Sequence, residues 1–141
     1  MENSDINTFH FENDCFVFDT TTFPQIFVKF KTPQPNKKQF YEYLDCMDTI
    51  FLQENKYVVL IELNGSEYLK AEFREKQAEW NNKHHQHMRE YCQGMANISH
   101  SQEQITIVKA IMKSYPPPSP ILITDTREKA EHWLANKMPL Y

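Results

Sequence analysis

The sequence is poor in glycine, with only two glycines in 141 residues. Loops that cradle phosphate groups need several glycines close together, so the sequence excludes a glycine-rich nucleotide loop. The three cysteines, Cys15, Cys46 and Cys92, are widely spaced and form no Cys-x-x-Cys pair. The chain therefore lacks the signature of a zinc ribbon or a dithiol redox site, and we expect buried thiols in a reducing compartment.

Long apolar runs and an excess of positive charge are also missing. No stretch approaches the ~20 apolar residues of a transmembrane helix. The acidic residues 1–5 lack the basic and apolar regions of a signal peptide. Fifteen Lys and Arg residues against 19 Asp and Glu residues give a net charge of −4, which argues against a nucleic-acid-binding surface. We therefore expect a soluble, cytoplasmic protein with no membrane span and no nucleic-acid partner.

The composition is that of a globular protein, with 40% hydrophobic and 24% charged residues. Its length fits one domain, residues 1–141. The most apolar run is residues 57–63, followed by Asn64-Gly65-Ser66. We predict a buried central strand there, opening into a loop and a long helix. In open α/β sheets the carboxyl edge of such a strand is the usual ligand side.

The patterns around that run predict alternating strands and helices. Residues 1–8 are expected to be flexible, and residues 9–31 to form short strands that begin with a hairpin. Between residues 36 and 137 we predict helices that begin after Asn36, Ser66, Ser101 and Asp125. We expect Gly94 to stop the second helix and Asp125 to cap the last one. This order predicts an α/β fold with a mixed, mainly parallel sheet and about four helices.

The last third of the chain carries a family pattern. Residues 111–123 lead through three prolines into an apolar strand, and the next helix contains Glu128-Lys129-Ala130 and Trp133-Leu134. With these features the chain resembles the stand-alone SpoIIAA-like proteins of the STAS group over roughly residues 25–137. The resemblance implies a SpoIIAA-like fold, related to anti-sigma-factor antagonists and to the cytoplasmic domains of sulfate transporters.

The resemblance also bears on phosphorylation. STAS domains that act as phosphorylation switches carry a serine or threonine at the start of the helix after the central strand. Residues 70–72 of this chain, Lys-Ala-Glu, have no hydroxyl there, so we do not expect such a switch. Ser66 is the nearest hydroxyl. It could hold a phosphate near a helix N-terminus or serve as a cap or turn residue, and serine is a preferred cap.

Arg74, Gln77 and Trp80 are spaced three residues apart on the predicted second helix. Trp80 could wall a cleft in which Arg74 anchors an anion, or it could pack on the sheet beside a surface arginine. His84 lies on the same apolar stripe and shares a helix face with His87. Because no third protein ligand or His-Glu-x-x-His pattern accompanies them, we expect no metal and no cofactor.

Two hypotheses of function follow. The first is a non-enzymatic regulatory or binding module of SpoIIAA-like type, which docks a protein or a small apolar or anionic ligand at residues 64–73. The second is a small enzyme with a cleft near Ser66, Arg74 and His84, although no nucleophile and base are recognisable. The many aromatic residues make a homodimer plausible. The candidate binding residues are Asn64, Gly65, Ser66, Arg74, Gln77, Trp80 and His84.

Overall fold

The computed structural model describes residues 8–31, 35–51, 54–63, 71–114 and 116–140. Within these ranges the strands are β1 (His10–Glu12), β2 (Phe16–Asp19), β3 (Gln25–Phe30), β4 (Tyr57–Glu62), β5 (Cys92–Ile98) and β6 (Ile121–Thr124). The helices are α1 (Lys37–Phe51), α2 (Ala71–Lys83), α3 (His85–Tyr91), α4 (Gln102–Ser114) and α5 (Arg127–Ala135). The expectation of flexibility for residues 1–8 falls outside the described residues, apart from Thr8.

The strands form one mixed sheet in the order β1-β2-β3-β4-β5-β6. Neighbours are antiparallel from β1 to β3 and parallel from β3 to β6. The predicted hairpin is present, because Asn13 Oδ1 accepts hydrogen bonds from the backbone N–H groups of Cys15 at 2.7 Å and Phe16 at 2.9 Å. Asparagine favours turns for this reason. The predicted α/β fold with a mixed, mainly parallel sheet is confirmed.

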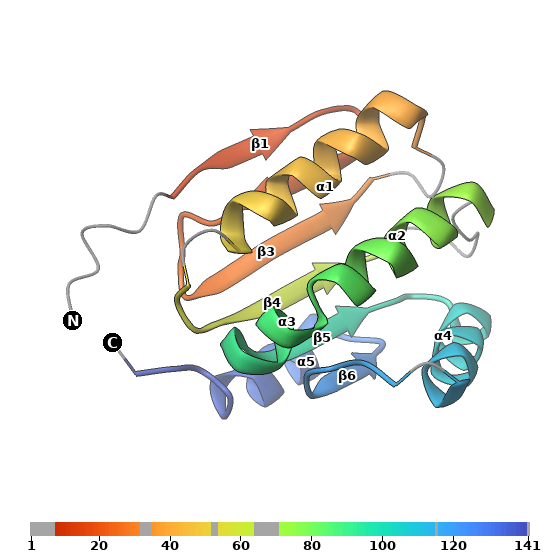
Figure 1. Ribbon diagram of the computed structural model, residues 1–141. Helices are drawn as coiled ribbons and strands as arrows, with labels where there is room; N and C mark the ends of the chain where they lie inside the picture. Colours follow the sequence, from red (N-terminus) through yellow and green to blue (C-terminus); the bar gives the residue numbers. More distant parts are fainter. Residues whose placement is uncertain (1–7, 32–34, 52–53, 64–70, 115, 141) are drawn as a thin grey trace.

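The predicted central strand is β4, which lies between β3 and β5, and its residues 57–61 are all buried. Successive side chains of a strand point to opposite faces of a sheet. Val59 and Ile61 face α1, α2 and α3, whereas Val58 and Leu60 face α5. Figure 1 shows the three helices in front of the sheet and α5 behind it. The molecule therefore has two separate cores, one on each face.

The helices begin mostly where the sequence predicts. Asn36 and Gln39 exchange two hydrogen bonds, at 2.8 and 2.9 Å, which is the reciprocal capping box at the start of α1. The predicted helix after Ser66 is instead two helices, because His84 leaves the helical conformation with φ −106° and ψ 13°. None of the described helices is both long and apolar enough to cross a bilayer.

Two predicted helix signals are wrong. Gly94 does not stop a helix but lies inside β5, where α5 and the residues after it pack closely. A Cβ at Gly94 would come within 3.2 Å of Trp133 Cζ3 and of Lys137 Cγ, which explains the glycine. Thr126, not Asp125, caps α5, because its hydroxyl accepts from the Lys129 N–H at 3.2 Å. The Asp125 carboxylate instead lies 3.3 Å from Lys129 Nζ.

Candidate ligand-binding site

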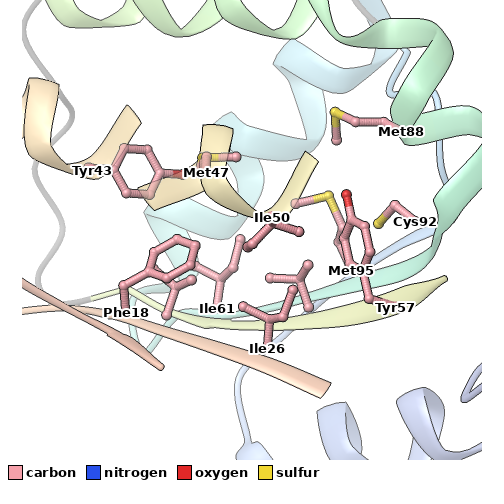
Figure 2. Close-up of a pocket in the computed structure, with 12 residues that line it drawn as sticks. Phe18, Ile26, Tyr43, Met47, Ile50, Tyr57, Ile61, Met88, Cys92 and Met95 are labelled. Atoms are coloured by element: carbon pink, nitrogen blue, oxygen red, sulfur yellow. The ribbon is translucent and has the colours of Figure 1, made fainter. Parts of the chain in front are cut away.

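The core between the sheet and helices α1 to α3, called the helical-face core here, contains a cavity of about 20 Å³. That is room for about one water-sized sphere. Apart from two phenols and one thiol, its lining is hydrocarbon or thioether. In Figure 2, Met47 and Met88 enter the space from opposite sides above Ile26 and Ile61. The lining residues are Phe18, Ile26, Val28, Tyr43, Met47, Ile50, Tyr57, Val59, Ile61, Met88, Cys92 and Met95.

The polar groups of this lining are uncharged at neutral pH. Burial raises the pKa of the Cys92 thiol to about 11, although Ser119 and the Gly94 carbonyl act in the opposite direction. Burial also raises the pKa of the Tyr43 and Tyr57 phenols well above their usual range. A protonated thiol is a poor nucleophile. The cavity therefore offers an apolar surface rather than a reactive group.

A polar cluster joins α1 to the junction of α2 and α3 beside this cavity. The Trp80 indole N–H donates to Asp48 Oδ1 at 2.8 Å. His84 Nε2 lies 3.4 Å from the same oxygen, and the His84 and Trp80 rings are 4.4 Å apart. Asp48 follows the cavity residue Met47, and His84 lies one helical turn before Met88. The cluster therefore ties together the two helices that bound the cavity.

The imidazoles of this region are held towards the neutral form. Burial lowers the pKa of His84, against the opposing effect of Asp48. Burial, followed by the proximity of His84, lowers the pKa of His87, whose ring lies tilted against that of Tyr91 at 4.6 Å. Among the described residues, no group of three or more His, Cys, Asp or Glu side chains is placed to hold a metal ion.

The structure brings together two of the predicted site residues, Trp80 and His84. Gln77 is separate from them and donates to Asn81 on its own helix at 3.0 Å. Asn64, Gly65 and Ser66 lie outside the described residues, and so does the side chain of Arg74. Phe73, at the end of the predicted docking segment, is 5% exposed and stacks on Phe40 at 4.8 Å, so its ring belongs to the core.

Asp48 is the important residue that sequence reasoning missed. In the sequence, Asp45, Asp48 and Glu54 form an acidic helix face, and solvation is its ordinary interpretation, because local spacing does not reveal a partner on another helix. Trp80, His84 and Met88, each four residues apart, were the available signal of a continuous stripe. That stripe indicated which residues share a face, but it did not identify the helix opposite.

Comparisons with known proteins support the fold. No protein-family model matches the chain, and no curated protein matches it either. A solved structure is similar over 91% of this chain and 92% of its own, with a TM-score of 0.60 and 12% sequence identity. It is an uncharacterised protein of the DUF3478 family with a SpoIIAA-like fold, from Shewanella loihica PV-4. At that identity the similarity concerns the fold alone, and the chain has a SpoIIAA-like fold.

Proposed function

We propose that this protein is a non-enzymatic binding module that takes a small apolar ligand into the helical-face core. The observation that carries the proposal is the cavity beneath α1 and α3, with its apolar lining and its three methionines. Methionine side chains are flexible and refill irregular spaces, so they can move aside at low cost. A ligand larger than the present cavity would displace Met47, Met88 and Met95. It would also separate α1 from α3.

The Asp48, Trp80 and His84 cluster supports this proposal, because it closes the gap between those helices with polar contacts. Polar contacts at a partly exposed site are individually weak. They can break and re-form without exposing the core on the other side of the sheet. Such a cluster stabilises a closed conformation of the two helices, and the free energy needed to open it is modest.

The described contacts favour binding over catalysis. His84 lies between the Asp48 carboxylate and the Trp80 ring, so its described contacts join two helices. Cys46 is buried, and burial together with Asp45 and Glu42 raises its pKa to about 12. All three cysteines are buried as thiols, which supports the proposed cytoplasmic location. A regulatory role, docking at residues 64–73 and a homodimer stay predictions.

The experiment is a titration with toluene, followed by NMR of chain labelled with ¹³C at the methionine methyl groups. Saturable shifts are expected at Met47, Met88 and Met95. Met138 is 36% exposed and lies outside this core, so it serves as the internal control. Shifts of equal size at Met138, or shifts that never saturate, would show non-specific contact and would contradict the proposal.

A further inference from the structure

A second hollow lies on the other side of α1, between this helix and the edge strand β1. Its volume is about 430 Å³, within the range of small-molecule sites. Figure 1 shows α1 and β1 running beside one another at this edge of the sheet. The residues that line it are Phe9, Phe11, Glu42, Asp45, Cys46 and Thr49. We call this hollow the edge groove.

The strand side of the edge groove is aromatic. Phe9 stacks on the buried Phe18 at 5.9 Å with nearly parallel rings, and Phe11 stacks on the buried Phe16 at 5.5 Å. Both outer rings are only partly buried, so they present aromatic surface to the groove. Stacking on the core fixes their positions. The faces of aromatic rings carry partial negative charge and attract cations.

The helix side is acidic. Glu42, Asp45, Cys46 and Thr49 follow the spacing i, i+3, i+4 and i+7, which places them on one stripe of α1. Glu42 is oriented by Asn13, whose amide Nδ2 donates to its carboxylate at 3.2 Å. In the described part of the chain, no Lys or Arg forms an ion pair with Glu42 or Asp45, whereas Glu12, Glu62 and Glu131 each have such a partner.

Carboxylates and aromatic rings that face one groove have little attraction for one another, but both attract a cation with an apolar body. We propose that the edge groove binds a small organic ammonium ion. Its alkyl groups would lie on Phe9 and Phe11, and its charge would face Glu42 and Asp45. The thiol of Cys46, at the base of the groove, feels the same negative field, which adds to the effect of burial in raising its pKa. This site is separate from the apolar cavity.

The test is an NMR titration of the whole chain with choline and with 3,3-dimethyl-1-butanol, its neutral carbon analogue. We expect choline to give saturable shifts at residues 9–12 and 42–49, with a dissociation constant in the millimolar range. The neutral analogue should bind at least ~10-fold more weakly, because it lacks the attraction to rings and carboxylates. Equal binding of the two probes would overturn the proposal. So would choline shifts that centre on Met88 and Met95, which line the apolar cavity instead.

The matched variants are Glu42→Gln with Asp45→Asn, compared with Glu72→Gln with Glu75→Gln. Each pair removes two negative charges, but Glu72 and Glu75 are exposed on α2. Glutamine keeps an oxygen that can accept from Asn13, so the first pair should fold, as a thermal melt will show. The first pair should weaken the affinity for choline at least ~10-fold, and the second pair should change that affinity less than ~2-fold. Equal loss in both pairs would indicate general charge attraction and would overturn the proposal.

Discussion

Val58 and Val59 are neighbours in β4, yet they face different environments. Val58 and Leu60 are 0% exposed beneath α5, whereas Val59 and Ile61 on the other face each retain 8%. The α5-face core consists of buried aliphatic residues, all 0% exposed: Val58, Leu60, Ala96, Ile98, Ala130 and Leu134. The helical-face core is richer in aromatic and sulfur-containing side chains and contains the cavity.

The difference lies in how the covering helices are held. One helix, α5, covers β4 to β6 so closely that Gly94 of β5 has no space for a Cβ. The other face is covered by α1, α2 and α3, and it includes a cavity lined by side chains of α1, α3 and the sheet. A filled core resists changes of a single methylene, whereas a loosely filled one can adapt. We infer that the tightly packed α5 face keeps the sheet rigid and that the other face leaves space for a ligand.

The largest expected effect is on the α5 face. Leu134→Ala should lower the free energy of unfolding by about 3–5 kcal/mol, because the tightly packed surroundings cannot collapse into the space. The partly exposed Met47→Ala should cost about 2 kcal/mol, at the low end for such truncations. Urea denaturation of both variants measures the difference. Equal losses would contradict the proposed contrast between the faces.

A methylene added to each face of β4 gives a smaller but more closely matched comparison. Val58→Ile should destabilise the protein by about 1–3 kcal/mol, because the α5-face core has no space for it. Val59→Ile should change stability by less than about 0.5 kcal/mol, because the neighbouring cavity can accept the added carbon. The two variants have identical chemistry and adjacent positions, so the same urea experiment compares them directly. Destabilisation by Val59→Ile as large as by Val58→Ile would show that the cavity is not adaptable.

Disrupting the polar cluster over the loosely packed face should reduce stability by a still smaller amount. Asp48→Ala removes the acceptor of the Trp80 indole and should cost about 1 kcal/mol. Asp48 is half exposed, so water can replace part of the lost interaction. Asp45→Ala on the same helix is the control and should change stability by less than about 0.5 kcal/mol. If the two variants are equally stable, the cluster does not hold α1 to the α2–α3 junction.

The smallest effect is a dependence of stability on pH from the same face. The folded pKa values of His84 and His87 are lowered from 6.5, so the unfolded chain binds protons more readily as the pH falls. The contribution of the two neutral histidines to the free energy of unfolding is complete above pH 6.5 and is lost as the pH falls below it. His84→Gln with His87→Gln should flatten the change in unfolding free energy between about pH 7.5 and 5.5. An unchanged slope in the double variant would argue against this account.

The elements that could be predicted from the sequence are those whose signal is local. Residues 58–61 point alternately to the two faces of the sheet and are buried on both. An apolar run of strand length was enough to predict this. The capping box of Asn36 and Gln39 is read from a spacing of three residues. The fold class followed from the order of such elements, and the similarity to a SpoIIAA-like structure is consistent with it.

The elements that could not be predicted depend on contacts between distant segments. Gly94 was expected to stop a helix, because its close neighbours Trp133 and Lys137 lie some 40 residues later. Asp48 was expected to be solvated, because its partners Trp80 and His84 are on another helix. His84 interrupts a helix whose sequence contains no proline or glycine at that point. Both proposed binding sites lie between segments far apart in the sequence.

Xenon tests the contrast between the two cores most directly, because it enters apolar cavities without needing any polar contact. The measurement is methyl NMR of the whole chain under xenon pressure. The account predicts saturable shifts at the methyl groups of Met47, Met88, Ile26 and Ile61, and none at those of Val58, Leu60, Ile98 and Leu134. Shifts of similar size on both faces, or shifts confined to the α5 face, would contradict it.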